Sequence, residues 1–191
     1  MHVGHLAAAR VAMDCAHLER VLFVPSSQPP HRGAATAPAQ DRLAMTRLAV
    51  EGEPRFEVSD IELTRGGASF TSDTLSELHR TRPDDELFLI LGWDAARLFN
   101  TWHEPARVNA LASVVIVGRP GAGTPTPADV AAAGLDPERV IECSAETPDV
   151  SATELRHALA AGQPVAGNLA PAVERYITKH SLYRDNRNVG T

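Results

Sequence analysis

Continuous apolar runs are the feature that most constrains the fold of this chain. Residues 86–92 read Glu-Leu-Phe-Leu-Ile-Leu-Gly, and residues 113–118 read Ser-Val-Val-Ile-Val-Gly. Strands that are apolar at almost every position are buried on both faces, as in a parallel sheet that helices cover. Similar but shorter runs predict three more strands, at residues 20–25, 55–61 and 139–144.

Helical patterns lie between these strands. They predict helices at residues 4–16, 39–51, 71–82, 94–100, 127–133, 151–161 and 171–180. The alternation of strands and helices predicts an α/β fold with a doubly wound parallel sheet, helices on both faces and right-handed crossovers. Ligands of such sheets bind at the carboxyl ends of the strands. We therefore expect one site along that edge.

The length of 191 residues fits one domain, which we place at residues 1–184, followed by a disordered tail at 185–191. A net charge of −6 gives no broad basic field, so we expect no nucleic-acid partner, and any phosphate site must be local. The sequence has no run of 18 apolar residues and no secretory signal, so we expect a cytoplasmic protein without a membrane partner. Nothing in the sequence indicates the oligomeric state.

The two cysteines, Cys15 and Cys143, stand far apart and belong to no CxxC or CxxH pattern. That isolation argues against a disulfide framework and against a zinc site. We expect two reduced, partly buried thiols and no metal held by the protein alone.

Two histidines open the first helix. His2 and His5 flank Gly4 in a His-x-Gly-His pattern, where unpaired backbone N–H groups and the helix dipole attract anions. Gly4 has no Cβ, so a phosphate can approach its backbone closely. The two imidazoles can donate hydrogen bonds to phosphate oxygens. The alternative is two surface histidines in an N-terminal tail.

A second candidate phosphate motif lies at residues 150–156, which read Val-Ser-Ala-Thr-Glu-Leu-Arg. The spacing of Ser151 and Glu154 predicts a capping box at the start of a helix. Arg156 lies one turn further on, where a guanidinium can bind a phosphate through two bonds. The alternative is an ordinary capping box with no ligand.

The two motifs together resemble the signatures of the nucleotidyltransferase superfamily, whose fold is Rossmann-like. The resemblance implies that Gly4, Ser151, Thr153 and Arg156 bind ATP, and that His2, His5 and Arg156 act in catalysis. In the superfamily, a central strand and a turn resembling Gly-Gly-Thr-Phe-Asp-Pro precede the first motif. The resemblance therefore implies that this strand is missing between residues 20–25 and 86–92, and that the true start lies upstream of Met1.

Three more segments resemble the bacterial nicotinate-nucleotide adenylyltransferases. They are Pro-Pro-His-Arg at residues 29–32, Gly-Ala-Ser-Phe-Thr-Ser-Asp-Thr-Leu at 67–75, and Gly-Trp-Asp at 92–94 followed by Thr-Trp-His at 101–103. Phe70 replaces the tyrosine of the family, and Trp93 stands where the family often has a small residue.

The resemblance implies a mononucleotide site made by five residues from these segments: His31, Arg32, Thr71, Asp94 and Trp102. His31 and Arg32 would bind its phosphate, and Thr71 its nicotinate carboxylate. Asp94 would accept hydrogen bonds from ribose or from water bound to Mg²⁺, and Trp102 would stack on the pyridine ring. The alternatives are an exposed loop for His31 and Arg32, a helix cap for Asp94 and core packing for Trp102.

The implied reaction transfers the adenylyl group of ATP to nicotinate mononucleotide, with Mg²⁺ bound to ATP, and gives nicotinate adenine dinucleotide and pyrophosphate. Two alternatives stay open. One is another adenylyltransferase, such as the pantetheine-phosphate type. The other is a non-catalytic nucleotide-binding remnant, which the missing strand would explain.

Overall fold

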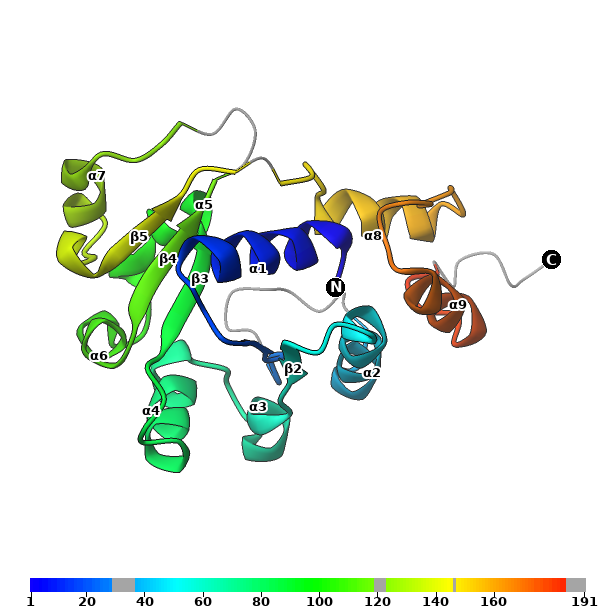
Figure 1. Ribbon diagram of the computed structural model, residues 1–191. Coiled ribbons are helices and arrows are strands. Elements are labelled where there is room, and N and C mark those ends of the chain that lie inside the picture. The colour runs from blue at the N-terminus through cyan, green and yellow to red at the C-terminus, as the bar shows by residue number, and fades with distance from the viewer. Residues whose placement is uncertain (29–36, 119–122, 146, 185–191) are drawn as a thin grey trace.

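The predicted alternation of strands and helices is present in the structure, a computed structural model that describes residues 1–28, 37–118, 123–145 and 147–184 (Figure 1). The strands are β1 (Val21–Phe23), β2 (Phe56–Val58), β3 (Phe88–Gly92), β4 (Ser113–Val117) and β5 (Val140–Cys143). Each lies inside a predicted strand range and is shorter than it. The α/β class is therefore confirmed.

The predicted helices also have counterparts. They are α1 (Val3–Cys15), α2 (Ala39–Val50), α4 (Thr71–Thr81), α5 (Trp93–Ala96), α7 (Pro127–Ala132), α8 (Ala152–Ala160) and α9 (Pro171–Lys179). The helix predicted at 94–100 divides into α5 and a 3₁₀ turn, Phe99–Thr101. Two short helices, α3 (Ile61–Arg65) and α6 (Pro105–Leu111), and a 3₁₀ turn, Pro137–Arg139, were not predicted, because so few residues show no clear period.

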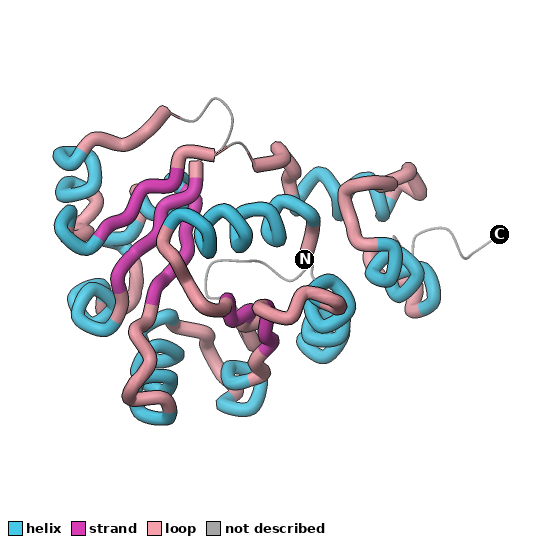
Figure 2. The backbone as a smooth tube through the Cα atoms, in the orientation of Figure 1, coloured by secondary structure: helices cyan, strands magenta, loops and turns pink. Residues whose placement is uncertain are grey.

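The strands pair in parallel but form two sheets (Figure 2). β3, β4 and β5 pair in that order, with Ile90 opposite Val115 and Val115 opposite Ile141. β1 pairs with β2, with Leu22 opposite Glu57. Within the described part of the chain, no ladder joins β1 to β3. The break lies between the two predicted strands, 20–25 and 86–92, where the resemblance places a missing strand.

Helices cover both faces of the larger sheet, because successive side chains of β4 pack against helices on opposite faces. Val115 and Val117 pack with Ala12 of α1 on one face. Val114 and Ile116 pack on the other face, in a cluster with side chains of α4, α5, α6 and α7. Both sets are almost fully buried, which explains why β4 is apolar at every position after Ser113.

Helix α1 also contacts the smaller sheet. Leu6, Ala9 and Met13 pack with Val21 of β1 and Phe56 of β2 in one buried cluster. In Figure 1 this helix crosses the molecule between the larger sheet and α8. One helix thus buries apolar surface against both sheets.

The C-terminal helices pack on α2. Met45 of α2, Leu155 of α8 and Val173 of α9 share a buried cluster. At its edge, the hydroxyl of Tyr176 donates a hydrogen bond of 2.8 Å to Oδ1 of Asp41. That bond, which the neutral phenol donates, raises the pKa of Tyr176.

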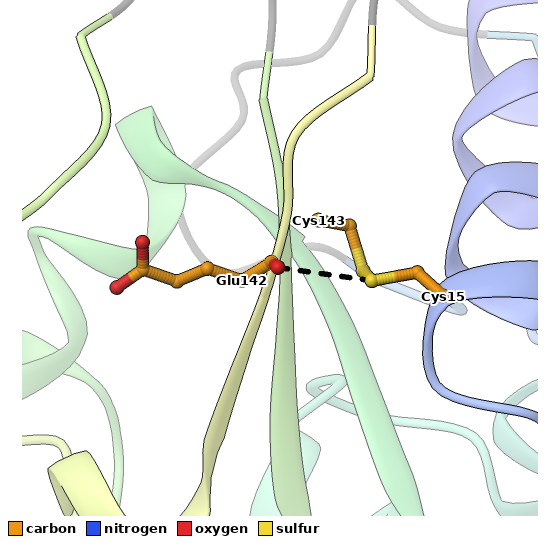
Figure 3. The surroundings of a disulfide bond; sticks show 3 residues. All are labelled: Cys15, Glu142 and Cys143. Carbon is orange, nitrogen blue, oxygen red and sulfur yellow. Dashed lines mark hydrogen bonds between the residues drawn. A yellow bond between two sulfur atoms is a disulfide. The ribbon is translucent and has the colours of Figure 1, made fainter.

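The expectation of two reduced cysteines was wrong, because Cys15 and Cys143 form a disulfide (Figure 3). Cys15 is the last residue of α1, and Cys143 is the last residue of β5. The two are 128 positions apart, so spacing motifs do not detect them. Packing of α1 on the larger sheet brings their Cα atoms to 5.9 Å, within the usual range for a disulfide.

The predicted tail at residues 185–191 lies outside the described residues.

Among the described helices, none is long and apolar enough to cross a membrane.

Ala12 of α1 is fully buried against β4, so we expect the size of its side chain to affect the stability of the protein. We expect Ala12→Leu to lower the free energy of unfolding by about 1–3 kcal/mol, because the added carbons have no free space. Urea unfolding followed by circular dichroism measures it. Ala7→Leu is the control, since Ala7 lies on the same helix but is only half-buried. Equal effects at both positions would contradict this role of α1.

Candidate functional site

A cavity of about 870 Å³ lies between the two sheets, where no ladder joins β1 to β3 among the described residues. Residues of β1 and β3 line its sides, and the first half of α1 lines its roof. It extends from Asp84–Glu86, before β3, to Gly92 at the carboxyl end of β3. The cavity therefore spans the height of the sheet, and only one of its ends has the candidate phosphate residues.

That end is formed by the start of α1. His2 is the N-cap residue and is buried, while His5 is exposed and both line the cavity. Their ring centroids are 3.8 Å apart, and the His2 N–H donates to Nδ1 of His5 at 3.3 Å. Because Nδ1 accepts, neutral His5 carries its proton on Nε2. His5 can thus donate to an anion through Nε2.

Gly4 makes a close approach possible at the same place. A Cβ on this residue would lie 3.1 Å from Nδ1 of His2 and 3.3 Å from the carbonyl oxygen of Pro148. Both distances are tighter than most real Cβ contacts, so a larger residue here would displace the imidazole or the backbone. The first helix is therefore held directly against the segment that precedes α8.

The start of α8 shows half of the predicted capping box. Oγ of Ser151 accepts from the Glu154 N–H at 3.3 Å, and the described hydrogen bonds include no return bond from Ser151 to the Glu154 side chain. Thr153 is exposed, and its Oγ1 accepts from the Arg156 guanidinium at 3.0 Å. Arg156 thus folds back toward the helix start.

The two motifs meet around the N-terminus of the chain. The Val3 N–H donates to the Asn168 carbonyl at 3.0 Å. Burial lowers the pKa of the Met1 amine, and the charges of Arg156 and Arg42 lower it further. Pro148 lies in the cavity wall together with His2, whereas Ser151, Thr153 and Arg156 are not among the residues that line it. The structure brings the motifs near one another without joining them in one pocket.

The mononucleotide residues are more dispersed. Thr71 begins α4 and lines the cavity. Asp94 is exposed on α5 and forms an ion pair with Arg97 at 3.5 Å. Trp102 is half-buried against the core beside Phe99, with ring centroids 5.4 Å apart, and neither it nor Asp94 lines the cavity. His31 and Arg32 lie outside the described residues.

One contact does connect two of the predicted segments. The ring of Phe70, just before Thr71, lies 4.1 Å from the ring of His103, just after Trp102. The segment at 67–75 and the segment at 101–103 are therefore neighbours, as a shared substrate would require. Trp93 packs against the core at the start of α5.

Sequence reasoning missed Arg42. Its guanidinium donates to the carbonyl oxygens of Ser26, Ser27 and Ala37 at 2.5, 3.0 and 3.1 Å. Arg42 therefore holds together described residues on either side of 29–36, the range that contains His31 and Arg32. No sequence signal identifies it, because its partners are backbone atoms.

A buried group on α3 and α4 was missed as well. Oε1 of Glu62 accepts a 2.7 Å bond from Thr74, and the Arg65 guanidinium donates to the same hydroxyl at 3.0 Å. Glu62 and Thr74 also line the cavity. Between the helices, Gly66 and Gly67 have φ values of 70° and 71°, a conformation that favours glycine. The hydrogen bonds between α3 and α4 therefore hold the ends of the turn that leads to Thr71.

Known proteins resemble this chain over nearly its whole length. Residues 1–158 match the model of the cytidylyltransferase-like family. The chain is 45% identical to a probable nicotinate-nucleotide adenylyltransferase of Thermus thermophilus, with 96% of this chain and 94% of that protein covered. A protein of the same name from Roseiflexus is 42% identical, with 96% and 92% covered.

Solved structures share the fold. A nicotinic acid mononucleotide adenylyltransferase of Plasmodium falciparum, complexed with NaAD, superposes with a TM-score of 0.77 at 15% identity, covering 96% of this chain and 91% of that one. A putative nicotinate-nucleotide adenylyltransferase of Vibrio parahaemolyticus gives 0.63 at 17% identity, covering 96% and 88%. These identities show the fold alone, which is Rossmann-like as expected. The match to the family model and the identity to full-length relatives show that this chain belongs to the cytidylyltransferase-like family, and within it to the nicotinate-nucleotide adenylyltransferases.

Proposed function

We propose that this chain transfers the adenylyl group of ATP to nicotinate mononucleotide and releases pyrophosphate. The observation that carries the proposal is that the start of α1 and the segment leading into α8 line the same end of the cavity. A Cβ on Gly4 would lie only 3.3 Å from the carbonyl oxygen of Pro148, although 144 positions separate the two residues. Helix starts attract phosphate through their N–H groups and dipoles. Two of them suit a triphosphate better than one.

The reaction needs positioning more than covalent chemistry. A phosphate oxygen of nicotinate mononucleotide attacks the α-phosphorus of ATP in line, and the bond to the leaving pyrophosphate breaks. In our assignment His2 and His5 donate to the ATP phosphates, with His5 acting through Nε2. Gly4 admits the phosphate to the backbone. No side chain forms a covalent bond to the substrate.

The second helix stabilises the leaving group. Arg156 already points back to Thr153 at the start of α8. Its guanidinium would exchange this neutral partner for the pyrophosphate oxygens, which accept stronger, charge-assisted bonds. Ser151 and Thr153 would add hydroxyl donors at the same helix start. Charge that develops on pyrophosphate is thereby neutralised.

Mg²⁺ would enter with ATP. Among the described residues, no group of three or more His, Cys, Asp or Glu side chains converges on one point. Mg²⁺ commonly keeps several waters and binds substrate phosphates with one or two carboxylates, so a site without a full protein cage fits this ion. When bound, it would neutralise part of the charge on the ATP phosphates.

We assign the mononucleotide to the segments near Thr71. The hydroxyl and N–H of Thr71 at the start of α4 would receive the nicotinate carboxylate. The contact of Phe70 with His103 supports a shared binding surface with Trp102, and Asp94 would accept from ribose or from water on Mg²⁺. His31 and Arg32 would bind the phosphate on a segment that Arg42 holds at both ends.

The break between β1 and β3 favours one competing function, a nucleotide-binding protein without catalysis. No ladder pairs β1 with β3 among the described residues, and a sheet interrupted beside the candidate phosphate residues would place them less firmly than a continuous one. Location in the cytoplasm stays a prediction, which cell fractionation tests.

Substrate choice provides the first test of this function. With Mg-ATP and equal concentrations of candidate acceptors, we expect pyrophosphate release with nicotinate mononucleotide and much less with phosphopantetheine. A coupled pyrophosphatase assay measures both. Faster release with phosphopantetheine would replace our assignment by the pantetheine-phosphate type. Binding of ATP with no release for either acceptor would establish the non-catalytic alternative.

Arg156 provides the second prediction. We expect Arg156→Ala to lower kcat by about 10²–10³-fold, the size typical for loss of one donor to a developing anion. Arg156→Lys should recover part of it, since a point charge lacks the two-bond geometry of guanidinium. Arg175→Ala on α9 is the matched control, an exposed arginine away from both motifs. A kcat for Arg156→Ala within twofold of the control would refute this role.

Trp102 provides the third prediction and separates stacking from packing. We expect Trp102→Ala to raise KM for nicotinate mononucleotide about 2–12-fold, which corresponds to a stack of roughly 0.5–1.5 kcal/mol. KM for ATP should stay unchanged, and Trp102→Phe should keep most of the affinity. If Trp102→Ala only lowers Tm and leaves both KM values alone, the side chain serves the core.

A further inference from the structure

The disulfide joins the end of the helix that follows the first phosphate motif to the strand that precedes the second. Cys15 ends α1, which begins beside His2 and Gly4. Cys143 ends β5, and from there the chain continues to Ser151 at the start of α8. Figure 3 shows the link between the end of the helix and the strand edge.

The same connection contacts both ends of α1. At one end Cys15 is bonded to Cys143, and at the other Gly4 lies against the carbonyl of Pro148. The helix rises about 17 Å between Gly4 and Cys15. Five residue steps, from Cys143 to Pro148, reach at most about 18 Å. The connection can therefore reach little further than the rise of the helix, so a bond at one end limits how far the other end can shift.

The two sulfur atoms differ in access. Cys143 is 3% exposed and packs with Ala12, Val115 and Val117. Cys15 is on an exposed part of the helix. Cys15 is therefore the more open of the two to a small thiol from solution, whereas Cys143 is shielded.

We propose that Cys15 and Cys143 are a reversible thiol–disulfide site that controls how firmly the protein binds phosphate groups at the starts of α1 and α8. Disulfides that form in reducing compartments are often transient and redox-sensing. The proposal rests on the function above for its ligand, ATP, and on the geometry of α1 for its mechanism.

The chemistry is exchange with a low-molecular-weight thiol such as glutathione. Its thiolate attacks Sγ of Cys15, the Cys15–Cys143 bond breaks, and Cys143 leaves as a thiolate that takes up a proton. A second glutathione thiolate attacks the glutathione sulfur of the mixed disulfide and releases Cys15. Overall, one protein disulfide is reduced to two thiols, and two glutathione molecules are oxidised to glutathione disulfide. Oxidation is the reverse reaction.

The reduced state keeps a weaker contact at the same place. Sγ of Cys15 lies 3.7 Å from the Glu142 carbonyl oxygen (Figure 3). A disulfide sulfur has no proton, so this is a packing contact in the oxidised protein and a weak hydrogen bond only when Cys15 carries S–H. Reduction therefore loosens the end of α1 without detaching it, since Ala12 and Met13 stay buried.

The test compares the whole chain after equilibration with glutathione disulfide or with reduced glutathione. Alkylation and intact-mass measurement count the free thiols, and calorimetry gives the Kd of Mg-ATP. We expect the oxidised form to bind about fivefold more tightly or better, the lower range of ordinary coupling between sites. Hydrogen exchange without ATP should be slower in the oxidised form in the first turn of α1 and at residues 147–155.

Cys15→Ser is the control, because it removes the disulfide and leaves every proposed ligand-binding residue intact. Its Kd and its exchange should not respond to glutathione. Two free thiols in the presence of glutathione disulfide would overturn the proposal, and so would equal exchange rates in the two states of the unaltered chain. If neither form binds Mg-ATP but exchange still differs, the coupling stands and the adenylyltransferase function fails.

Discussion

Packing of α1 against both sheets is the interaction on which the rest of this structure depends. Ala12 contacts the larger sheet, and Leu6, Ala9 and Met13 contact the smaller one. Small side chains on this helix allow its backbone to lie close to the strands. Within the described residues no strand ladder joins the sheets, so apolar burial does much of what hydrogen bonds do elsewhere. Apolar burial has no preferred direction, unlike a strand ladder. A cavity of about 870 Å³ remains beneath the helix.

The same helix positions the place where we propose that phosphate binds. Its start lies against Pro148, so its N–H groups and the segment before Ser151 share one end of the cavity. Its end is bonded through Cys15 to Cys143, where that segment begins. A rigid rod with the candidate anion site at one end and a disulfide at the other gives a direct route between oxidation and binding. Coupling of this kind needs no large movement, because packed elements respond to small shifts.

The candidate site could be predicted where its chemistry is local. His2, Gly4 and His5 share one helix start, and the Ser151 cap spans three residues, so both are visible as short patterns. Arg42 was not visible, because it binds the carbonyls of Ser26, Ser27 and Ala37. Any residue has a carbonyl, so the sequence gives no sign of it. Asp94 and Trp102 lie on or beside the expected elements, but the cavity does not reach them.

The sequence by itself determined the strands, most helices, the α/β class and the two phosphate motifs. All of these follow from side-chain period or from contacts within one turn, which neighbours in the chain decide. The tertiary structure decided the rest. It placed the break between β1 and β3, joined Cys15 to Cys143 across 128 positions, and brought Gly4 to Pro148. These contacts depend on how α1 settles on two sheets, and that is fixed by the summed burial of many distant side chains, which no local pattern records.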